Sequence, residues 1–441
     1  AGKTPVNLNF TMGRAAAESC LKTADIKDVV SSEAMRKKIS DANQNFPWAE
    51  NFIDIAKTVS ETKPFDISVG LEKILEHFGI EKFSKNEKEA TLVFTSGSEG
   101  APKAAILTER NIIANCLQTR LSNVFSEGDI LLANLPVFHS FGLLFEIWAL
   151  AINGVKSLLL ASPIDIKANL RAIRQYRPNV MLGSPTFYRA YIRHAEKEDM
   201  QSLRMAIAGA EKTPDGFEEL WNSRFSPNSY KEGYGLTETS PVVGVNMPDV
   251  DYGWYSTGTR KGSIGKLFPG MRAKILDAST LKPLPFGERG LLALQGANVF
   301  AGYLNNPEAT KNTLNDGWIV TGDLARIDKD GFLFIDGRLS RFSKIGGEMV
   351  PHATVESALS NALGFDKSDI PLISSKLDEG KGEALVLVTT VDIDHRQVKE
   401  ALKAEGISNL WTPKHIVKTD RIPLLPSGKL NLKELSEIAE Q

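Results

Sequence analysis

Strand-like and helix-like segments alternate between residues 90 and 236, and this alternation constrains the fold more than any other feature of the sequence. Apolar runs such as VKSLLLA, NVMLG and LRMAIAGA are each followed by a segment with the pattern of a helix. Strands that are apolar throughout are typical of parallel sheets that helices cover on both faces. The alternation therefore predicts an α/β fold with a doubly wound sheet.

The pattern changes after residue 260, where short strands are separated by Gly, Pro and Asp-Gly turns. DKDG between LARI and FLFI predicts a hairpin within a small β-rich subdomain, built as a barrel or a distorted sheet. Beyond Arg338 the strand EALVLVTTV and the helix DHRQVKEALKAEG indicate a compact α+β unit. We therefore expect a large domain over residues 1–337 and a small domain over residues 341–441.

Composition excludes several classes of protein. The net charge of −2 argues against a nucleic-acid-binding surface over the whole molecule. With only Cys20 and Cys116, a disulfide framework or paired metal-ligand spacing is not possible, which favours a reducing, cytosolic compartment. The longest apolar region, residues 141–161, is interrupted by Glu146 and Lys156, so it indicates a core helix followed by a strand rather than a membrane span.

A glycine- and hydroxyl-rich segment, TSGSEGAPK, occupies residues 95–103 after an apolar run. Bare backbone N–H groups, hydroxyl donors and one lysine suit phosphate. A flexible surface loop is the simplest alternative. The loop of ordinary nucleoside triphosphatases is a second alternative, but it needs Lys directly after Gly with the helix starting at once. Here Pro102 precedes Lys103, KAAIL indicates a short strand, and the helix is expected to begin after a cap at Thr108.

The third alternative is a resemblance to the adenylate-forming superfamily, which includes acyl-CoA synthetases, luciferases and peptide-synthetase adenylation domains. Residues 94–103 match the pattern [YF]-T-S-G-[ST]-[TE]-G-x-P-K of that superfamily at every specified position. Further motifs that resemble those of the superfamily follow in order: LPVFHSFG (135–142), AGAEK (208–212), EGYGLTETSP (232–241), GWIVTGDLARIDKDGFLFIDGR (317–338) and LPSGKL (425–430). The chain is thereby identified as a member of this superfamily.

The resemblance implies that a carboxylate is joined to the α-phosphate of ATP, with Mg²⁺ as the second cofactor. The residues that it assigns to the β- and γ-phosphates are Thr95, Ser96, Gly97, Ser98, Gly100 and Lys103. Those that it assigns to the rest of the nucleotide are Gly209, Ala210, Glu211, Tyr234 and Gly235 around adenine, Asp323 at the ribose, and Arg338 at the ribose or phosphate. A core tyrosine and a turn-forming aspartate are the structural alternatives for Tyr234 and Asp323.

Five residues carry the implied chemistry. Thr237 would contact the α-phosphate, Glu238 would bind the metal, and His139 would border the acyl pocket together with Phe141, Gly142 and Trp148. Lys429 would act in adenylation, whereas Lys344, with Gly347 approaching the pantetheine, would act in thioester formation. For each lysine considered alone, an exposed surface side chain is the structural alternative.

The same resemblance implies a hinge at residues 338–340, about which the C-terminal domain rotates between the two steps. The usual Asp or Lys of this hinge is replaced by Ser340, which leaves the identity of the hinge residue open. Cations near the hinge (Arg338, Arg341 and Lys344), with Lys414 and Lys418, predict that an acidic carrier protein is steered to the site.

Glu99, LPVFHSFG and GGEMV resemble most closely the acyl-[acyl-carrier-protein] synthetase part of bacterial 2-acylglycerophosphoethanolamine acyltransferases. This implies a fatty acid substrate, acyl carrier protein or CoA as the acceptor, and lysophospholipid re-acylation in the cytoplasm. We expect an acyltransferase part that would bring the protein to the inner face of the membrane to be missing, since HRQVKE at His395 does not supply its H-x-x-x-x-D motif. The start at Ala1 likewise predicts a truncated N-terminal domain.

Two other functions remain open. One is a fatty acyl-CoA ligase, because both acceptors present the same thiol. The other is a nucleotide-binding scaffold without turnover, which an N-terminal truncation would favour. Against the scaffold, Lys103, Glu238, Asp323 and Lys429 are all intact.

Overall fold

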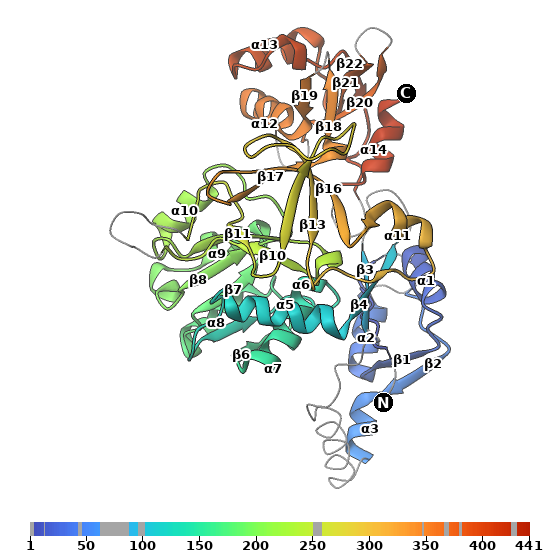
Figure 1. Ribbon diagram of the computed structural model, residues 1–441, viewed down its shortest axis with the longest axis vertical. Helices are drawn as coiled ribbons and strands as arrows, with labels where there is room; N and C mark the ends of the chain where they lie inside the picture. Colours follow the sequence, from blue (N-terminus) through green and yellow to red (C-terminus); the bar gives the residue numbers. More distant parts are fainter. Residues whose placement is uncertain are drawn as a thin grey trace.

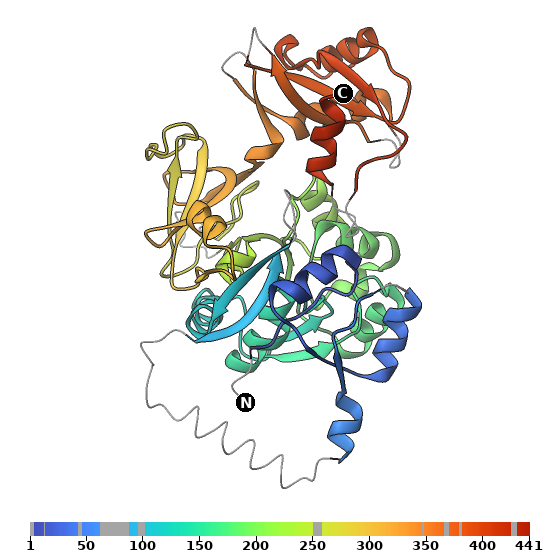
Figure 2. The same cartoon turned by 90° about the vertical axis from the view of Figure 1, so that its right-hand side faces the viewer.

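The computed structural model describes residues 4–12, 14–42, 46–61, 88–95, 102–249, 258–345, 348–365, 370–378, 382–424 and 430–441. A large body of sheets and helices occupies the lower part of both views, and a smaller domain made of the last hundred or so residues stands above it (Figures 1 and 2). The fold is therefore mixed α/β, with a large N-terminal and a small C-terminal domain, as the sequence predicts.

The central sheet of the large domain has seven strands in the order β11-β10-β9-β8-β7-β5-β6. Neighbouring strands from β6 to β9 are parallel, and β10 and β11 add an antiparallel edge. The strands are β5 (Ile130–Ala133), β6 (Lys156–Leu159), β7 (Val180–Gly183), β8 (Met205–Ala208), β9 (Tyr230–Gly235), β10 (Val242–Val245) and β11 (Lys266–Leu267).

Helices cover both faces of this sheet, as a doubly wound sheet requires. Along β7 and β8 alternate side chains enter two different cores, because successive residues of a strand point to opposite faces. One core contains residues of α5 (Glu109–Leu121), α6 (Ser140–Leu143) and α7 (Ala149–Asn153). The other contains residues of α8 (Ile166–Tyr176), α9 (Pro185–His194) and α10 (Phe217–Arg224).

The helix expected from the apolar stretch after residue 140 is interrupted. A π-helical segment, η1 (Leu144–Trp148), separates α6 from α7. Glu146 in this segment is 8% exposed, and its carboxylate accepts a hydrogen bond from the backbone N–H of Leu135, which follows β5. π-Helical turns are uncommon and often occur at functional sites. Short 3₁₀ segments occur at η2 (Lys197–Met200) and η5 (Asn409–Trp411).

The apolar run before the glycine-rich segment belongs to a second, smaller sheet and not to the central one. Strands β3 (Glu89–Thr95) and β4 (Lys103–Thr108) are antiparallel, and β14 (Gly302–Tyr303) pairs with the other edge of β4. The strand-like alternation could not show this, since an apolar strand looks the same in either sheet. Two local expectations are confirmed: KAAIL is a strand, and Thr108 caps α5 by accepting a hydrogen bond from the N–H of Asn111.

The N-terminal segment adds a two-stranded parallel sheet beside the large body (Figure 1). Its elements are α1 (Arg14–Thr23), β1 (Asp28–Ser31), α2 (Glu33–Ala42), β2 (Asn51–Asp54) and α3 (Ile55–Glu61).

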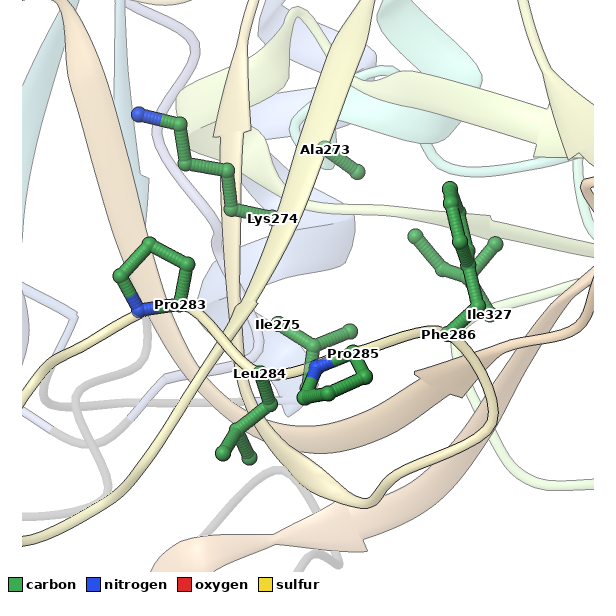
Figure 3. A pocket seen from close by; sticks show the side chains of 8 residues that line it. All are labelled: Ala273, Lys274, Ile275, Pro283, Leu284, Pro285, Phe286 and Ile327. Carbon is green, nitrogen blue, oxygen red and sulfur yellow. The ribbon is translucent and has the colours of Figure 1, made fainter.

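The β-rich subdomain is a five-stranded antiparallel sheet. It consists of β12 (Arg272–Leu276), β13 (Gly290–Gln295), β15 (Leu314–Asn315), β16 (Trp318–Ile327) and β17 (Leu333–Arg338), and α11 (Pro307–Thr313) precedes β15. The predicted DKDG hairpin joins β16 to β17. Figure 3 shows a pocket of about 200 Å³ on this subdomain, lined by none of the predicted site residues. Its lining is Ala273, Lys274, Ile275, Pro283, Leu284, Pro285, Phe286 and Ile327.

The C-terminal domain has its own sheet, in the order β19-β18-β21-β20 with β22 beside β21. The strands are β18 (Phe342–Ile345), β19 (Glu348–Pro351), β20 (Leu372–Asp378), β21 (Gly382–Thr389) and β22 (His415–Lys418). The helices are α12 (His352–Leu363), α13 (His395–Ala404) and α14 (Leu432–Ala439). Separate apolar cores lie on the two faces of the sheet, one under α12 and α13 and the other under α14. Within the described ranges, no helix is long and apolar enough to cross a bilayer.

Candidate active site

Glu238 lies on a short 3₁₀ turn, η3 (Thr237–Thr239), that follows β9 and leads back into β10. The backbone N–H of Leu236 donates to the carbonyl oxygen of Pro241 at 2.9 Å, which closes the turn. Only glycine fits at position 235, because a Cβ there would lie 2.2 Å from the same Pro241 oxygen. The predicted nucleotide residue Gly235 thus lets the chain fold back tightly enough to present Thr237 and Glu238.

Buried amides on α5 and a neighbouring loop hold this turn in place. Asn115 donates to the carbonyl oxygen of Val242 at 2.8 Å and accepts from its N–H at 2.9 Å. Asn298 donates to the carbonyl oxygen of Thr239 at 2.7 Å. Both asparagines are fully buried, so these bonds also satisfy groups that would be costly to leave unpaired. Sequence reasoning missed both, although for Asn115 the polar residues at three- and four-residue spacing on a core-facing helix were a visible signal.

The Glu238 carboxylate is fixed by Tyr303 of β14. The Tyr303 hydroxyl donates to Oε1 of Glu238 at 2.6 Å, and the backbone N–H of Phe300 donates to the Glu238 carbonyl oxygen at 2.9 Å. Burial, and then the negative charge of Glu238, raise the pKa of the Tyr303 hydroxyl, so it stays protonated as a donor. Nζ of Lys103 lies 4.9 Å from the centre of the Tyr303 ring. Tyr303 therefore joins the predicted phosphate and metal residues.

Asp323 is the most buried of the predicted site carboxylates, with 4% of its surface exposed. The Tyr234 hydroxyl donates a hydrogen bond to Oδ2 of Asp323, and Nε of Arg338 lies 2.8 Å from Oδ1. Burial raises the pKa of the Asp323 carboxyl, whereas the charge of Arg338 and the hydrogen bond from Tyr234 oppose that rise. The negative charge of Glu238 also raises this pKa, by a smaller amount.

The turn after β8 brings Gly209, Ala210 and Glu211 to the end of the parallel strands. Ala210 has a φ of +67°, a left-handed conformation that residues other than glycine seldom adopt. An added Cβ at Gly209 would lie 3.6 Å from the ring of Phe141, which places the turn against the predicted acyl-pocket segment. The Glu211 carboxylate accepts a hydrogen bond from the Thr186 hydroxyl at 2.7 Å. That bond ties the turn to the start of α9.

His139 lies at the N-terminal end of α6, beside the turn that carries Thr237. The hydroxyls of the adjacent Ser140 and of Thr237 are 3.2 Å apart. The rings of His139 and Phe138 are 4.7 Å apart, and Phe141 packs edge-on against Phe145. The structure therefore brings the LPVFHSFG segment to the α-phosphate residue that the sequence predicts.

Lys344 is the predicted residue that lies away from this cluster, on β18 in the C-terminal domain. Its backbone N–H donates to Glu383, and its charge lies near Asp277, whose pKa is lowered first by hydrogen bonds from Thr280 and Ser279 and then by Lys344. The remaining predicted site residues lie outside the described ranges: Ser96, Gly97, Ser98, Gly100, Gly347 and Lys429.

The cations expected to steer a carrier protein take part in ion pairs. Arg341 binds both oxygens of Glu356 at 2.6 Å, and Lys414 and Lys418 lie 2.6 and 2.7 Å from Asp378 and Asp392. Arg338 is paired with Asp323. These four charges are therefore partly compensated within the chain.

Comparison with known families decides the classification. A family described as AMP-binding enzyme matches residues 1–304, which is more than two thirds of the chain. The chain belongs to the AMP-binding enzyme family. Among curated members of the family, 4-coumarate--CoA ligase-like 9 of Arabidopsis thaliana is 30% identical over 362 residues, which cover 79% of this chain and 62% of that protein. A long-chain-fatty-acid--CoA ligase of Salmonella typhimurium is 29% identical, with coverage of 80% and 62%. The chain thus spans somewhat under two thirds of these relatives.

Solved structures of AMP-binding enzymes share the fold. ATP-bound MatB from Rhodopseudomonas palustris superimposes with a TM-score of 0.78 at 24% identity, covering 99% of this chain and 84% of that one. The AMP complex of O-succinylbenzoate coenzyme A synthetase from Bacillus subtilis gives 0.76 at 22% identity, with coverage of 98% and 82%. At this level of identity the likeness establishes the architecture of both domains.

Proposed function

We propose that the protein is an AMP-forming acid–thiol ligase. A carboxylate oxygen attacks the α-phosphorus of ATP, acyl-AMP forms and pyrophosphate leaves. A thiol then attacks the acyl carbon, a thioester forms and AMP leaves. The observation that carries this proposal is that Lys103, Glu238 and Asp323, which come from three different sheets or turns, are each contacted by a tyrosine of the site. The Tyr303 hydroxyl donates to Glu238 and its ring lies near Lys103, while the Tyr234 hydroxyl donates to Asp323.

Both reactants of the first step are anions, so the site must supply position and positive charge. Lys103 supplies a cation for the phosphates, and Asp323 supplies a buried acceptor for the ribose hydroxyls. Glu238 is suited to Mg²⁺, an ion that often binds through one carboxylate together with substrate phosphates and water. When bound, the metal neutralises charge on the triphosphate. Thr237 and Ser140 present hydroxyl groups beside the proposed triphosphate site, and the turn at Gly209 borders the proposed adenine site.

We assign the second step to Lys344, on β18 of the C-terminal domain. Arg338 is bound to Asp323 and the Thr321 carbonyl oxygen of the large domain, while Arg341 is bound to Glu356 and the Ile373 carbonyl oxygen of the small one. Only Leu339 and Ser340 lie between these anchors. We propose that rotation occurs at these two residues and exchanges Lys429 for Lys344 at the reacting carbonyl group.

A fatty acid is the acyl substrate that we favour, because the segment beside the turn at Gly209 is apolar, with Phe141 and Phe145 in contact. A relative named as a long-chain-fatty-acid--CoA ligase supports this choice. Names of other relatives, feruloyl-CoA synthase and 4-coumarate--CoA ligase-like 9, make aromatic acids the second class to test.

For the acceptor, we propose the pantetheine thiol that CoA and acyl carrier protein share. Names of the relatives support CoA, and the pairing of the predicted steering cations removes one argument for carrier protein. The motif GGEMVPH still supports carrier protein, and with it lysophospholipid re-acylation. Acyl transfer to CoA and to holo-carrier protein, each measured across a salt series, separates them. Transfer to CoA alone would exclude the carrier-protein function, and transfer to carrier protein that weakens with salt would establish it.

A further inference from the structure

Tyr303 contacts two residues of opposite charge in the candidate site. Its hydroxyl donates to Oε1 of Glu238 at 2.6 Å, and its ring centre lies 4.9 Å from Nζ of Lys103. Only 6% of its surface is exposed. Its hydroxyl is thus hydrogen-bonded to a carboxylate, and a cation lies near its ring. Both charged partners are residues that we assign to the binding of the metal and the triphosphate.

The position of Tyr303 is set by backbone pairing. In β14, Gly302 is paired with Ile106 and Tyr303 with Ala105 of β4, the strand that begins at Lys103. The N–H of Tyr303 also donates to the Thr310 hydroxyl at 2.9 Å. The ring is therefore fixed relative to the strand that carries the lysine, while its hydroxyl reaches across to the turn that carries the glutamate.

We propose that Tyr303 is a positioning residue that sets the Glu238 carboxylate for metal binding and holds Lys103 beside the phosphates. The inference rests on the proposed function. Its hydroxyl occupies Oε1, which leaves Oε2 available to a divalent cation. The negative face of its ring attracts the lysine ammonium. Without Tyr303, the free carboxylate and ammonium could turn towards each other, and each would have to be freed before ATP and Mg²⁺ bind.

The effects of the two contacts can be separated by substituting Tyr303 and by removing the metal. Tyr303→Phe keeps the ring and removes the hydroxyl, whereas Tyr303→Leu removes both. The affinity of the full chain for ATP is measured by calorimetry without any carboxylic acid, once with excess Mg²⁺ and once with EDTA. We expect Tyr303→Phe to bind ATP about tenfold more weakly in Mg²⁺, the size of one hydrogen bond to a charged group, with little change in EDTA. Tyr303→Leu should bind more weakly under both conditions.

Tyr191→Phe is the matched control, because it removes a hydroxyl from another buried tyrosine, which contacts the neutral Asn134. Its ATP affinity should equal that of the wild type. Glu238→Gln and the double variant Glu238→Gln/Tyr303→Phe form the second test. Neither variant leaves a carboxylate without its hydrogen-bond donor, so the two can be compared even where Tyr303→Phe alone does not fold. If the hydroxyl acts through Glu238, both should bind ATP equally in Mg²⁺.

Equal affinity of the wild type and Tyr303→Phe in Mg²⁺ would overturn the proposal, as would an equal loss in Mg²⁺ and EDTA. A further loss in the double variant relative to Glu238→Gln would also overturn it. A wild-type chain that binds no ATP under either condition would instead refute the proposed function, so the two failures are distinguishable.

Discussion

Nε of Arg338 lies 2.8 Å from Oδ1 of Asp323, and this ion pair joins the last residue of β17 to the candidate ribose-binding carboxylate on β16. Asp323 and Arg338 are also direct partners in the strand register. The carboxylate is buried, while the guanidinium is half exposed at the edge of the large domain. An ion pair therefore links the candidate ribose-binding carboxylate to Arg338, and Arg338 directly precedes the proposed pivot in the chain.

We expect the charge state of Asp323, which Tyr234 influences, to make nucleotide binding dependent on pH. Burial raises the pKa of Asp323, and the bond from Tyr234 opposes the rise. A carboxyl group with a raised pKa loses its charge at a higher pH as the solution is acidified. We expect AMP affinity in Tyr234→Phe to begin falling at a higher pH than in the wild type. Calorimetric titrations between pH 5 and 8 measure this. Superimposable pH profiles would contradict it.

Glu146 makes stability dependent on pH. Burial raises its pKa to about 7, although hydrogen bonds from the Leu135 and Asn134 N–H groups oppose the rise. The folded state therefore binds this proton more tightly than the unfolded state, so the contribution of Glu146 to stability falls as pH rises from about 4.5 to about 7. Glu146→Gln stays neutral throughout. Relative to wild type, this variant should gain up to about 3 kcal/mol between pH 4.5 and 8 in urea unfolding. A constant difference would contradict the expectation.

Arg341 should be required for the integrity of the C-terminal domain. Its side chain is 18% exposed and that of Glu356 is 13% exposed, so removal of one partner leaves a largely buried charge. Arg341→Ala should lower the free energy of unfolding by about 3 kcal/mol. The double variant Arg341→Ala/Glu356→Ala should recover part of that loss, whereas recovery of none would show that the pairing is not the cause.

The two lysines should separate the half-reactions. Lys429→Ala should abolish carboxylate-dependent exchange while sparing thioester formation from supplied acyl-adenylate, and Lys344→Ala should do the reverse. Lys376→Ala, in the same domain and outside the proposed site, is the control for both assays. Equal loss of both steps in both variants would contradict rotation of the domain.

Sequence patterns predicted β5, β6, β7 and β8 of the central sheet because each is a short apolar run bounded by turns, whereas β9, with the sequence YKEGYG, has no such run. They also predicted the cap at Thr108 and the DKDG hairpin, which depend on local chemistry alone. The placement of β3 in a separate antiparallel sheet could not be read, since an apolar strand looks the same in either sheet and the third strand of this sheet, β14, pairs with β4 from about 200 positions away. The π-helical segment at Glu146 could not be predicted either, because a single buried carboxylate leaves no periodic pattern in the sequence.

The candidate site likewise contains some residues that the sequence predicted and others that it did not. Lys103, Glu238 and Asp323 are recognisable from the motifs that contain them. Tyr303, Asn115 and Asn298 were missed, because their significance lies in contacts that span about 60 to 130 positions in sequence. The pairing of Arg341, Lys414 and Lys418 with acids could not be read from their charge alone, and it weakens the steering argument that the same charges first supported.

The most direct test of adenylation is the exchange of labelled pyrophosphate into ATP driven by added carboxylic acids. Fatty acids of graded chain length and the aromatic acids 4-coumarate and ferulate are each added with ATP and Mg²⁺. We expect exchange that requires an acid and Mg²⁺, and that falls by at least about a hundredfold in Glu238→Gln. ATP binding by the wild type without exchange for any acid would contradict it, and would leave a nucleotide-binding protein without turnover.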